Sequence, residues 1–409
     1  MLQYYGVVLR NPSSIVRPPP RVKTMSRQLC YSLPMSVVLA TLYVLLAIVV
    51  LAAAKLIADR IRRPASPRPV DYSGRAFPPD FKWFTGEDAY QHEGGNRAND
   101  WAIMEESESS PVANHDKNEL AADFFHRYEE DFSVCAAQGH QAHRIGVEWS
   151  RIEPQRGEYD ENALRVYVKM LDSLRAKGMQ TFLNIWHFTL PLWASELGGW
   201  ENPDFMHDWI RFVRTLATTF GDRVDFWSTM IDSQIYALRS YALGETPPFV
   251  RDQTRFLAVL AALVRAHGEA YRVIKAETSR GAVGQIYFFD VLEPRGSFPD
   301  TLVCRQLDRI FNTAYLDALW NGRLDLSVLG GPSIHEDGTV ARQRLDWLGV
   351  NYYRRVLVSF DPRSDGMLRQ EARQDSPKTD LGWEIYPEGI YRVLTGLAER
   401  YPDLPLYIT

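Results

Sequence analysis

The stretch that decides the fold is NALRVYVKMLDSLRAKGMQTFLNIW, residues 162–186. Its first part carries apolar side chains at a spacing close to the 3.6 residues of a helical turn, and Gly178 follows as a helix-ending residue. Its second part, from Gln180, is a short apolar run with the length and composition of a buried strand. A helix that leads directly into a buried strand is typical of the repeating unit of a parallel α/β sheet.

The same alternation extends along most of the chain. A second helical pattern that ends in glycine spans residues 204–221. Together with QTFLNIW (180–186), the predicted strands are FKWFTG (81–86), AHRIGVEW (142–149), DFWSTMID (225–232), AVGQIYFF (282–289), LDWLGVNYY (345–353) and LPLYIT (404–409). These seven strands with crossover helices predict an α/β fold, a (β/α)8 TIM barrel that is truncated after its seventh strand. An open, doubly wound sheet is the alternative, but no GxGxxG motif follows the first strand.

Residues 35–54, MSVVLATLYVLLAIVVLAAA, run for twenty positions without a charge. At about 1.5 Å per helical residue they would cross roughly 30 Å of bilayer hydrocarbon, which predicts one N-terminal transmembrane helix. The alternative is a signal peptide that is cleaved at the small residues 52–54.

The predicted membrane helix divides the chain into four parts. Residues 1–34 form a basic tail, 35–54 the helix, 55–80 a Pro/Arg-rich linker and 81–409 the barrel, which is expected to be incomplete at its C-terminus. Basic residues flank the helix on both sides. More of them follow the helix than precede it, which favours the cytosolic side of a membrane for the barrel.

The composition excludes several classes of function. With a net charge of −5 and scattered Lys and Arg, the chain lacks the basic stripe that a nucleic-acid-binding surface needs. Cys30, Cys135 and Cys304 are too few and too scattered for a disulfide framework or a zinc site. Because no CxxC, HExxH or phosphate-loop motif is present, neither a metal nor a cofactor is expected.

Polar side chains stand at or just after the ends of the predicted strands, where TIM barrels carry their chemistry. Amides, an imidazole, an arginine, carboxylates and aromatic rings at one mouth suit a polyhydroxylated ring. Such a ligand needs hydrogen bonds on its edges and apolar stacking on its faces. Glu148 lies four positions after Arg144, so strand alternation predicts a structural salt bridge between the two. The candidate site residues are Gln91, Arg144, His187, Asp232, Asn351 and Tyr353.

These segments resemble glycoside hydrolase family 1, the β-glucosidase and β-galactosidase family. The resemblance runs from about Phe77 to the last residue. It rests on AYQHEGG, HRIGVEWSRIEP, NIWHFTLPLWASELGGWENPDF, LGVNYYRR and GWEIYPEGIY. It implies a (β/α)8 barrel that hydrolyses β-glycosides with retention of configuration. It further implies roles for the candidate residues: sugar-hydroxyl binding by Gln91 and His187, a place beside the nucleophile for Arg144, and support of the catalytic centre by Asn351 and Tyr353.

The chain departs from the family at the end of the fourth strand. The family has Thr-Phe-Asn-Glu-Pro there, with Glu as the acid/base and Asn on the sugar 2-hydroxyl, whereas residues 229–233 read TMIDS. Asp232 therefore takes the acid/base position with a side chain one methylene shorter, and a displacement of roughly 1 Å can lower a rate on the order of a hundredfold. Ile231 takes the sugar-binding position and has no hydrogen-bond donor. Family-type catalysis is expected to be weaker as a result.

The resemblance places the nucleophilic Glu of the family directly after Ile408-Thr409, so the natural chain is expected to continue. Two functions are compatible with these residues. The first is a membrane-anchored enzyme that hydrolyses or transfers β-linked glycosyl groups and acts on a β-glycoside or a glycolipid. The second is a catalytically inactive sugar-binding protein or scaffold, which the changes at Ile231 and Asp232 favour.

Overall fold

The computed structural model describes residues 35–61 and 76–409, apart from positions 329, 339, 341 and 365–366. The predicted basic tail, 1–34, and residues 62–75 of the predicted linker lie outside the described residues. The division of the chain into four parts therefore stays a prediction.

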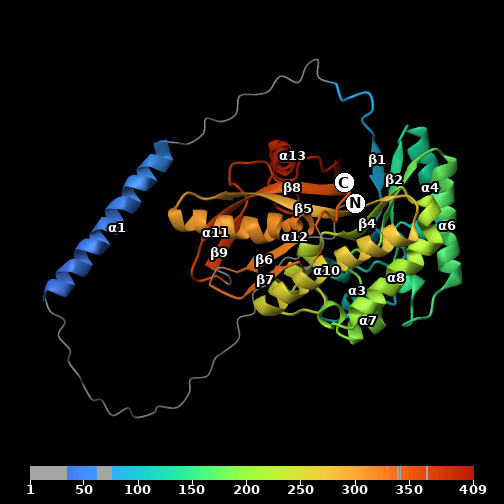
Figure 1. Cartoon of the computed structure of the whole chain (residues 1–409), viewed down its shortest axis with the longest axis horizontal. Coiled ribbons are helices and arrows are strands. Elements are labelled where there is room, and N and C mark those ends of the chain that lie inside the picture. The colour runs from blue at the N-terminus through green and yellow to red at the C-terminus, as the bar shows by residue number, and fades with distance from the viewer. Residues whose placement is uncertain (1–34, 62–75, 329, 339, 341, 365–366) are drawn as a thin grey trace, which may run out of the picture.

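The main sheet is parallel along its path and curls around its own interior (Figure 1). Its strands adjoin one another in chain order, so the sheet has no point at which the order reverses. This order excludes the doubly wound alternative. All of the predicted strand segments are present, as β1 (Phe84–Gly86), β2 (Ala142–Gly146), β3 (Gln180–Asn184), β4 (Phe226–Ile231), β5 (Ala282–Pro294), β8 (Trp347–Phe360) and β10 (Leu406–Ile408).

Among the described strands, β1 and β10 form the two ends of this path and do not pair with each other. The fold is therefore a curled parallel half-barrel, in agreement with the predicted TIM-barrel type. The closed eight-stranded form is not seen in the described residues.

Helices lie along the outer face of the sheet (Figure 1). Helix α6 illustrates why they form. The side chain of Asp160 accepts hydrogen bonds from the first backbone N–H groups, and a buried face that includes Tyr167 and Leu171 packs into the main core. The longer helices are α4 (Phe124–Ala137), α6 (Glu161–Ala176), α8 (Phe205–Phe220), α10 (Gln253–Glu277), α11 (Phe298–Asp308), α12 (Ala314–Asn321) and α13 (Glu388–Arg400).

Shorter helical segments occupy the connections between strands and outer helices. Several of them follow strand ends directly and thus border the mouth of the half-barrel. They are α2 (Ala89–His92), α3 (Asp100–Glu106), α5 (Trp149–Ile152), α7 (Leu192–Glu196) and α9 (Ser233–Ala237), with the 3-10 or π segments η1 (Ala113–His115), η2 (Gly199–Glu201), η3 (Gly221–Arg223), η4 (Leu238–Leu243) and η5 (Arg309–Thr313).

Aromatic rings fill the interior of the half-barrel. The rings of Phe182 and Phe226 stack with their centroids 4.2 Å apart, and Phe84 stacks on the other side of Phe182 at 5.2 Å. Trp347 and Tyr407 pack edge-on against this stack. Because side chains fill the space, the interior is a packed core that fixes the strand ends above it.

Strands β5 and β8 continue together past the length of a barrel strand, with a register shift between Phe289 and Val291. The short strand β9 (Leu368–Glu371) pairs antiparallel with the far half of β8. A separate hairpin is formed by β6 (Arg323–Ser327) and β7 (Ser333–Asp337). The sequence patterns did not predict β6, β7, β9 or the extension of β5 and β8.

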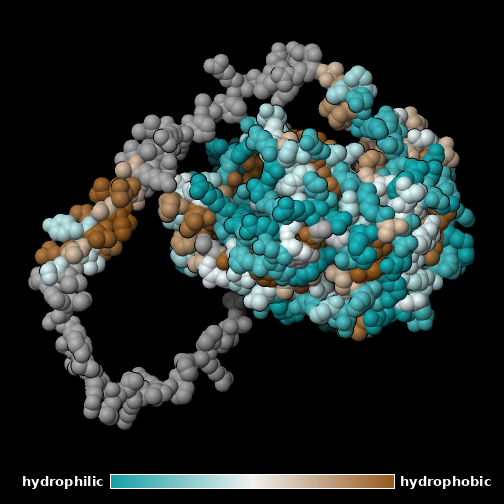
Figure 2. Space-filling model, viewed as in Figure 1, coloured by the Kyte–Doolittle hydropathy of each residue, from teal (hydrophilic) through white to brown (hydrophobic). Residues whose placement is uncertain are grey.

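The predicted membrane segment lies within helix α1 (Met35–Ile61), which is mostly hydrophobic, whereas the visible face of the sheet body is mainly hydrophilic (Figure 2). In the part of the chain that the structure describes, no helix has both the length and the hydropathy needed to cross a bilayer. The prediction of a transmembrane helix at 35–54 is therefore not supported. The predicted location at the cytosolic side of a membrane stays untested.

Candidate active site

Asp232 stands where β4 ends and α9 begins. Its backbone adopts a left-handed conformation with φ of 52° and ψ of 43°, which aspartate tolerates better than most residues. The side chain is buried, and both of its oxygens accept from the amide Nδ2 of Asn351, at 3.0 and 3.2 Å. The hydroxyl of Thr409 donates to Oδ1 of the same amide at 2.9 Å, which fixes the orientation of Asn351. The two predicted residues Asp232 and Asn351 are thus in direct contact.

The environment of Asp232 favours its neutral form. Burial raises the pKa of this carboxyl group to about 7, although the charge of His187 and the hydrogen bond from Asn351 oppose the rise. A carboxyl group with a pKa near 7 holds a proton in a substantial part of the molecules at neutral pH and can donate it. This is the electrostatic requirement for a general acid.

A second carboxylate, Asp88, lies between two of the predicted site residues. It follows β1 and forms an ion pair with Arg144 of β2, and its Oδ1 lies 3.3 Å from Nδ1 of His187. Burial favours its neutral form, but the charges of Arg144 and His187 hold the pKa of Asp88 well below its ordinary value. Asp88 was not predicted, although its place two residues after a strand end is the kind of position at which the other candidates were found.

A small pocket of about 30 Å³ adjoins these groups and is lined by Asp88, Gln91 and His187. Three residues of its lining each have a buried polar atom without a hydrogen-bond partner among the described residues: Nε1 of Trp101, Oδ1 of Asn184 and Nε2 of His187. Unsatisfied buried acceptors and donors are rare in folded proteins and often mark the place of a ligand or a water. The structure therefore brings the polar side chains of Gln91 and His187 to one small cavity.

A larger pocket of about 390 Å³ opens on the other side of Asp232. Tyr353 stacks on Phe288 with a centroid distance of 5.2 Å and lies 5.7 Å from Trp383. Although Tyr353 is 42% exposed, partial loss of hydration and the nearby charge of Asp232 raise the pKa of its phenol above its ordinary value. Much of the remaining lining is aliphatic: Ile235, Leu238, Leu243, Leu292, Leu307 and Leu381.

Ile231 directly precedes Asp232 and has a different environment. Its side chain is buried in the interior cluster that contains Phe182, Ile286 and Trp347. This position offers a ligand no polar atom from the side chain. The predicted loss of a hydrogen-bond donor there agrees with the packing, whereas the proposed contact of this position with a sugar stays a prediction.

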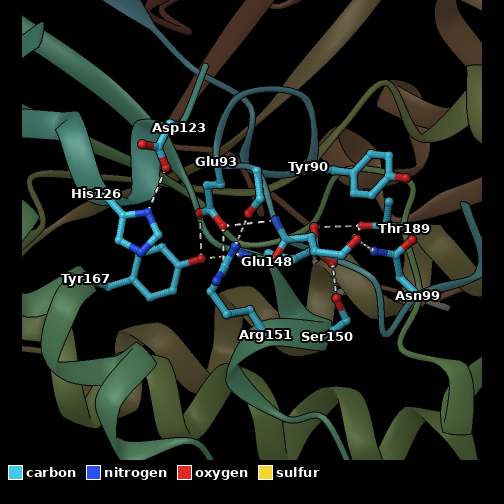
Figure 3. A network of polar contacts seen from close by, with 12 residues as sticks. Tyr90, Glu93, Asn99, Asp123, His126, Glu148, Ser150, Arg151, Tyr167 and Thr189 are labelled. Atoms are coloured by element: carbon cyan, nitrogen blue, oxygen red, sulfur yellow. Dashed lines mark hydrogen bonds and ion pairs between the residues drawn. The ribbon is translucent and has the colours of Figure 1, made fainter. Parts of the chain in front are cut away.

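A buried polar network supports the small pocket (Figure 3). Glu148 accepts from Oγ of Ser150 at 2.6 Å and from Oγ1 of Thr189 at 3.0 Å, and burial raises its pKa to about 7. The predicted salt bridge between Glu148 and Arg144 is therefore wrong. Its physical reason is that β2 ends at Gly146, so strand alternation does not extend to Glu148.

The same network holds the segment that follows Gln91. Arg151 donates to Oε2 of Glu93 at 2.9 Å and to the carbonyl oxygen of Gly94, and the hydroxyl of Tyr167 donates to Oε1 of Glu93 at 2.6 Å. These contacts anchor the turn after α2 and thereby the helix that carries Gln91. Within the described ranges, no group of three or more His, Cys, Asp and Glu side chains is arranged to hold a metal ion.

Comparisons with known proteins agree with this arrangement. The family model for glycosyl hydrolase family 1 matches residues 73–409. The chain is 29% identical over 349 residues to a 1,4-beta-D-glucan glucohydrolase of Thermotoga neapolitana, covering 82% of each chain.

Solved structures show the same likeness. The chain is similar to the beta-glucosidase from Thermotoga maritima in complex with deoxynojirimycin, with a TM-score of 0.74, 29% identity and coverage of 81% of this chain and 78% of that chain. It is also similar to the beta-glycosidase from Pyrococcus horikoshii, with a TM-score of 0.73, 27% identity and coverage of 81% and 75%.

Proposed function

The chain belongs to glycosyl hydrolase family 1, and from this membership we propose that it hydrolyses or transfers β-linked glycosyl groups, with Asp232 as the acid. The observation that carries this proposal is the buried carboxyl group of Asp232, whose pKa is raised to about 7. It stands at the end of a barrel strand in the wall of the larger pocket, and its pKa is influenced by His187 and Asp88, which line the smaller pocket.

The acid half of the reaction follows from the contacts of Asp232. The neutral carboxyl group donates its proton to the glycosidic oxygen while the bond from that oxygen to the anomeric carbon breaks. The bonding electrons stay with the oxygen, which leaves as an alcohol, and the sugar is left with oxocarbenium character. The carboxylate left behind is stabilised by the hydrogen bond from Asn351. When water or another acceptor then attacks the anomeric carbon, the carboxylate of Asp232 takes up the proton that is released.

The two pockets suit different parts of one substrate, the sugar ring and the aglycone. The small cavity with Gln91 and His187 suits hydroxyl groups of the sugar ring. The apolar pocket beside Tyr353 and Trp383 suits the other part, an aryl or alkyl group, and a glycolipid is one substrate of this kind. A β-glycoside with an apolar aglycone is the substrate class that the described lining favours.

The test compares two substrates that differ in their need for an acid. Octyl β-glucoside has a poor leaving group and depends on protonation, whereas 4-nitrophenyl β-glucoside has a good one. For Asp232→Asn, kcat/KM for the octyl glycoside should fall by about a hundredfold or more, the usual contribution of a general acid, and should fall much less for the nitrophenyl glycoside. Unchanged rates, or equal losses on both substrates, would show that Asp232 is not the acid.

Ile231 favours a second candidate, a sugar-binding protein without turnover. The family residue at this position contacts the sugar 2-hydroxyl, and such contacts contribute several kcal/mol to the transition state. Ile231 is packed among apolar side chains and offers no such contact. Binding of 4-nitrophenyl 1-thio-β-glucoside without turnover of either test substrate would support this candidate and contradict the first.

A further inference from the structure

Asp88 is a partly buried carboxylate in the lining of the small pocket, and the acid step does not use it. Its Oδ1 accepts from Nη1 of Arg144 and lies 3.3 Å from Nδ1 of His187. The side chains of Asp88, Arg144 and His187 are only 19%, 12% and 12% exposed. One carboxylate thus contacts two of the candidate site residues, Arg144 of the neighbouring strand β2 and His187 after the next strand, β3.

The contact with Asp88 decides which nitrogen of His187 carries a proton. An ionised carboxylate only accepts hydrogen bonds, so the imidazole nitrogen that faces it must be the N–H. The charge of Arg144 keeps Asp88 ionised against the effect of its burial. A positively charged His187 carries protons on both nitrogens, and when the ring is neutral its single proton sits on Nδ1.

The opposite nitrogen of the ring is then free for a ligand. His187 lines the small pocket, and its Nε2 is buried and has no hydrogen-bond partner among the residues that the structure describes. With Nδ1 bound to Asp88, the ring cannot turn over without losing that contact. Nε2 is thus held toward the cavity as a hydrogen-bonding group of defined character.

We propose that Asp88 is a positioning residue. By accepting a hydrogen bond from Nδ1 it holds the imidazole ring of His187 in one orientation, so that Nε2 can bind a sugar hydroxyl in the small pocket. The inference rests on the proposed function for the nature of the ligand. The alternative is a purely structural role, in which Asp88 only links β1 to β2 through its ion pair with Arg144. The two alternatives differ in what happens at His187 when Asp88 is changed.

The first test is spectroscopic and needs no ligand. In ¹⁵N-histidine-labelled full-length protein, the signal of His187 is identified by its loss in His187→Gln. In the wild type this signal should show a proton on Nδ1. Arg144 donates to the same oxygen, so an amide at this position would keep its own oxygen there. In Asp88→Ala, which has no acceptor, the signal should therefore change to the Nε2-protonated form. An unchanged signal would overturn the proposal. Asp88→Val serves the same purpose if Asp88→Ala does not fold.

The second test measures binding of 4-nitrophenyl 1-thio-β-glucoside, which is neutral and resists hydrolysis. Asp88→Ala should weaken binding by about ten- to hundredfold, the effect of losing a charge-assisted hydrogen bond. His187→Gln should do the same, and the double variant should bind no more weakly than His187→Gln alone. If the two losses of affinity instead multiply in the double variant, Asp88 acts independently of His187, through its link between β1 and β2. That result would overturn the proposal.

A matched pair provides the control. Asp123 contacts Nδ1 of His126 at 2.7 Å in the same way, but His126 is 73% exposed and neither residue lines either pocket. Asp123→Ala should leave the affinity unchanged. Failure of the proposed function is visible separately, as binding by the wild type without turnover. A wild type that does not bind the thioglucoside would overturn the inference about Nε2.

Discussion

The burial of Asp232 predicts the pH dependence of activity on an alkyl β-glucoside. An acid with a pKa of about 7 loses its proton above that pH, so kcat/KM should fall about tenfold per pH unit on the alkaline side. The hydrogen bond from Asn351 favours the ionised form. Asn351→Ala should therefore raise this pKa and shift the alkaline limb to higher pH in a pH–rate profile. A limb that stays in place or shifts downward would contradict this assignment.

The sequence indicated most site residues because each stands at the end of an apolar run that reads as a strand. Asp232 and Asn351 meet as this reasoning requires. Asp88 was missed because the pairing of three strands, and not any local pattern, brings it to Arg144 and His187. The partner of Glu148 was wrong for a related reason, since the point at which β2 ends cannot be located within a continuous apolar stretch.

Because β5 and β8 pack closely at Gly284, one added methyl group there should strongly reduce the stability of the protein. A Cβ at Gly284 would lie 2.3 Å from the backbone oxygen of Trp347, which cannot move without disturbing the sheet. Gly284→Ala should lower the free energy of unfolding by at least 1–3 kcal/mol, roughly the range for overpacking. Urea denaturation measures this change.

Gly396 provides the matched control for the same substitution. It lies in α13, and a Cβ there would meet nothing within 4 Å. Gly396→Ala should raise the free energy of unfolding by about 0.5–1 kcal/mol, because alanine restricts the unfolded chain and favours the helix. Similar losses in both variants would mean that the close contact at Gly284 is not the cause.

The central barrel strands were predictable because they are mostly buried and rich in apolar residues, whereas β1 and β10, at the two ends of the sheet, are largely exposed and were predictable from their short apolar or aromatic runs. Strands β6, β7 and β9 were not, because much of each is exposed and their composition is polar. The extension of β5 was missed because the apolar run is interrupted at Asp290. That residue is buried through its ion pair with Arg354, a partner 64 positions away that no local pattern reveals.

The molecule as a whole should lose stability as the pH rises from about 4.5 to 7. Burial raises the pKa values of Asp100, Glu148 and Asp232 to about 7 in the folded state, while the unfolded chain keeps values near 4. In this window the folded state holds more protons than the unfolded state. Each group therefore lowers the free energy of unfolding by up to about 1.4 kcal/mol per pH unit, and the effect levels off above pH 7.

Denaturant unfolding at pH 5, 6 and 7 measures this slope. Glu148→Gln keeps hydrogen-bonding capacity to Ser150 and Thr189 but cannot ionise, so its slope should be shallower than that of the wild type. Asp88, whose pKa is lowered, acts in the opposite direction but only below about pH 4. Stability that increases with pH between 5 and 7 would be inconsistent with these buried neutral acids.

Trp383 places a fluorescent indole ring in the wall of the apolar pocket. Its indole ring lies 5.7 Å from the ring of Tyr353 and 4.7 Å from the guanidinium carbon of Arg354, in the wall beside Asp232. Indole emission depends on nearby charge, water and absorbing groups. A nitrophenyl ring in this pocket would quench the emission, whereas an alkyl chain that displaces water would move it to shorter wavelength. Binding of an aglycone in this pocket should therefore be detectable as a change in tryptophan fluorescence, and aryl and alkyl aglycones should produce different changes.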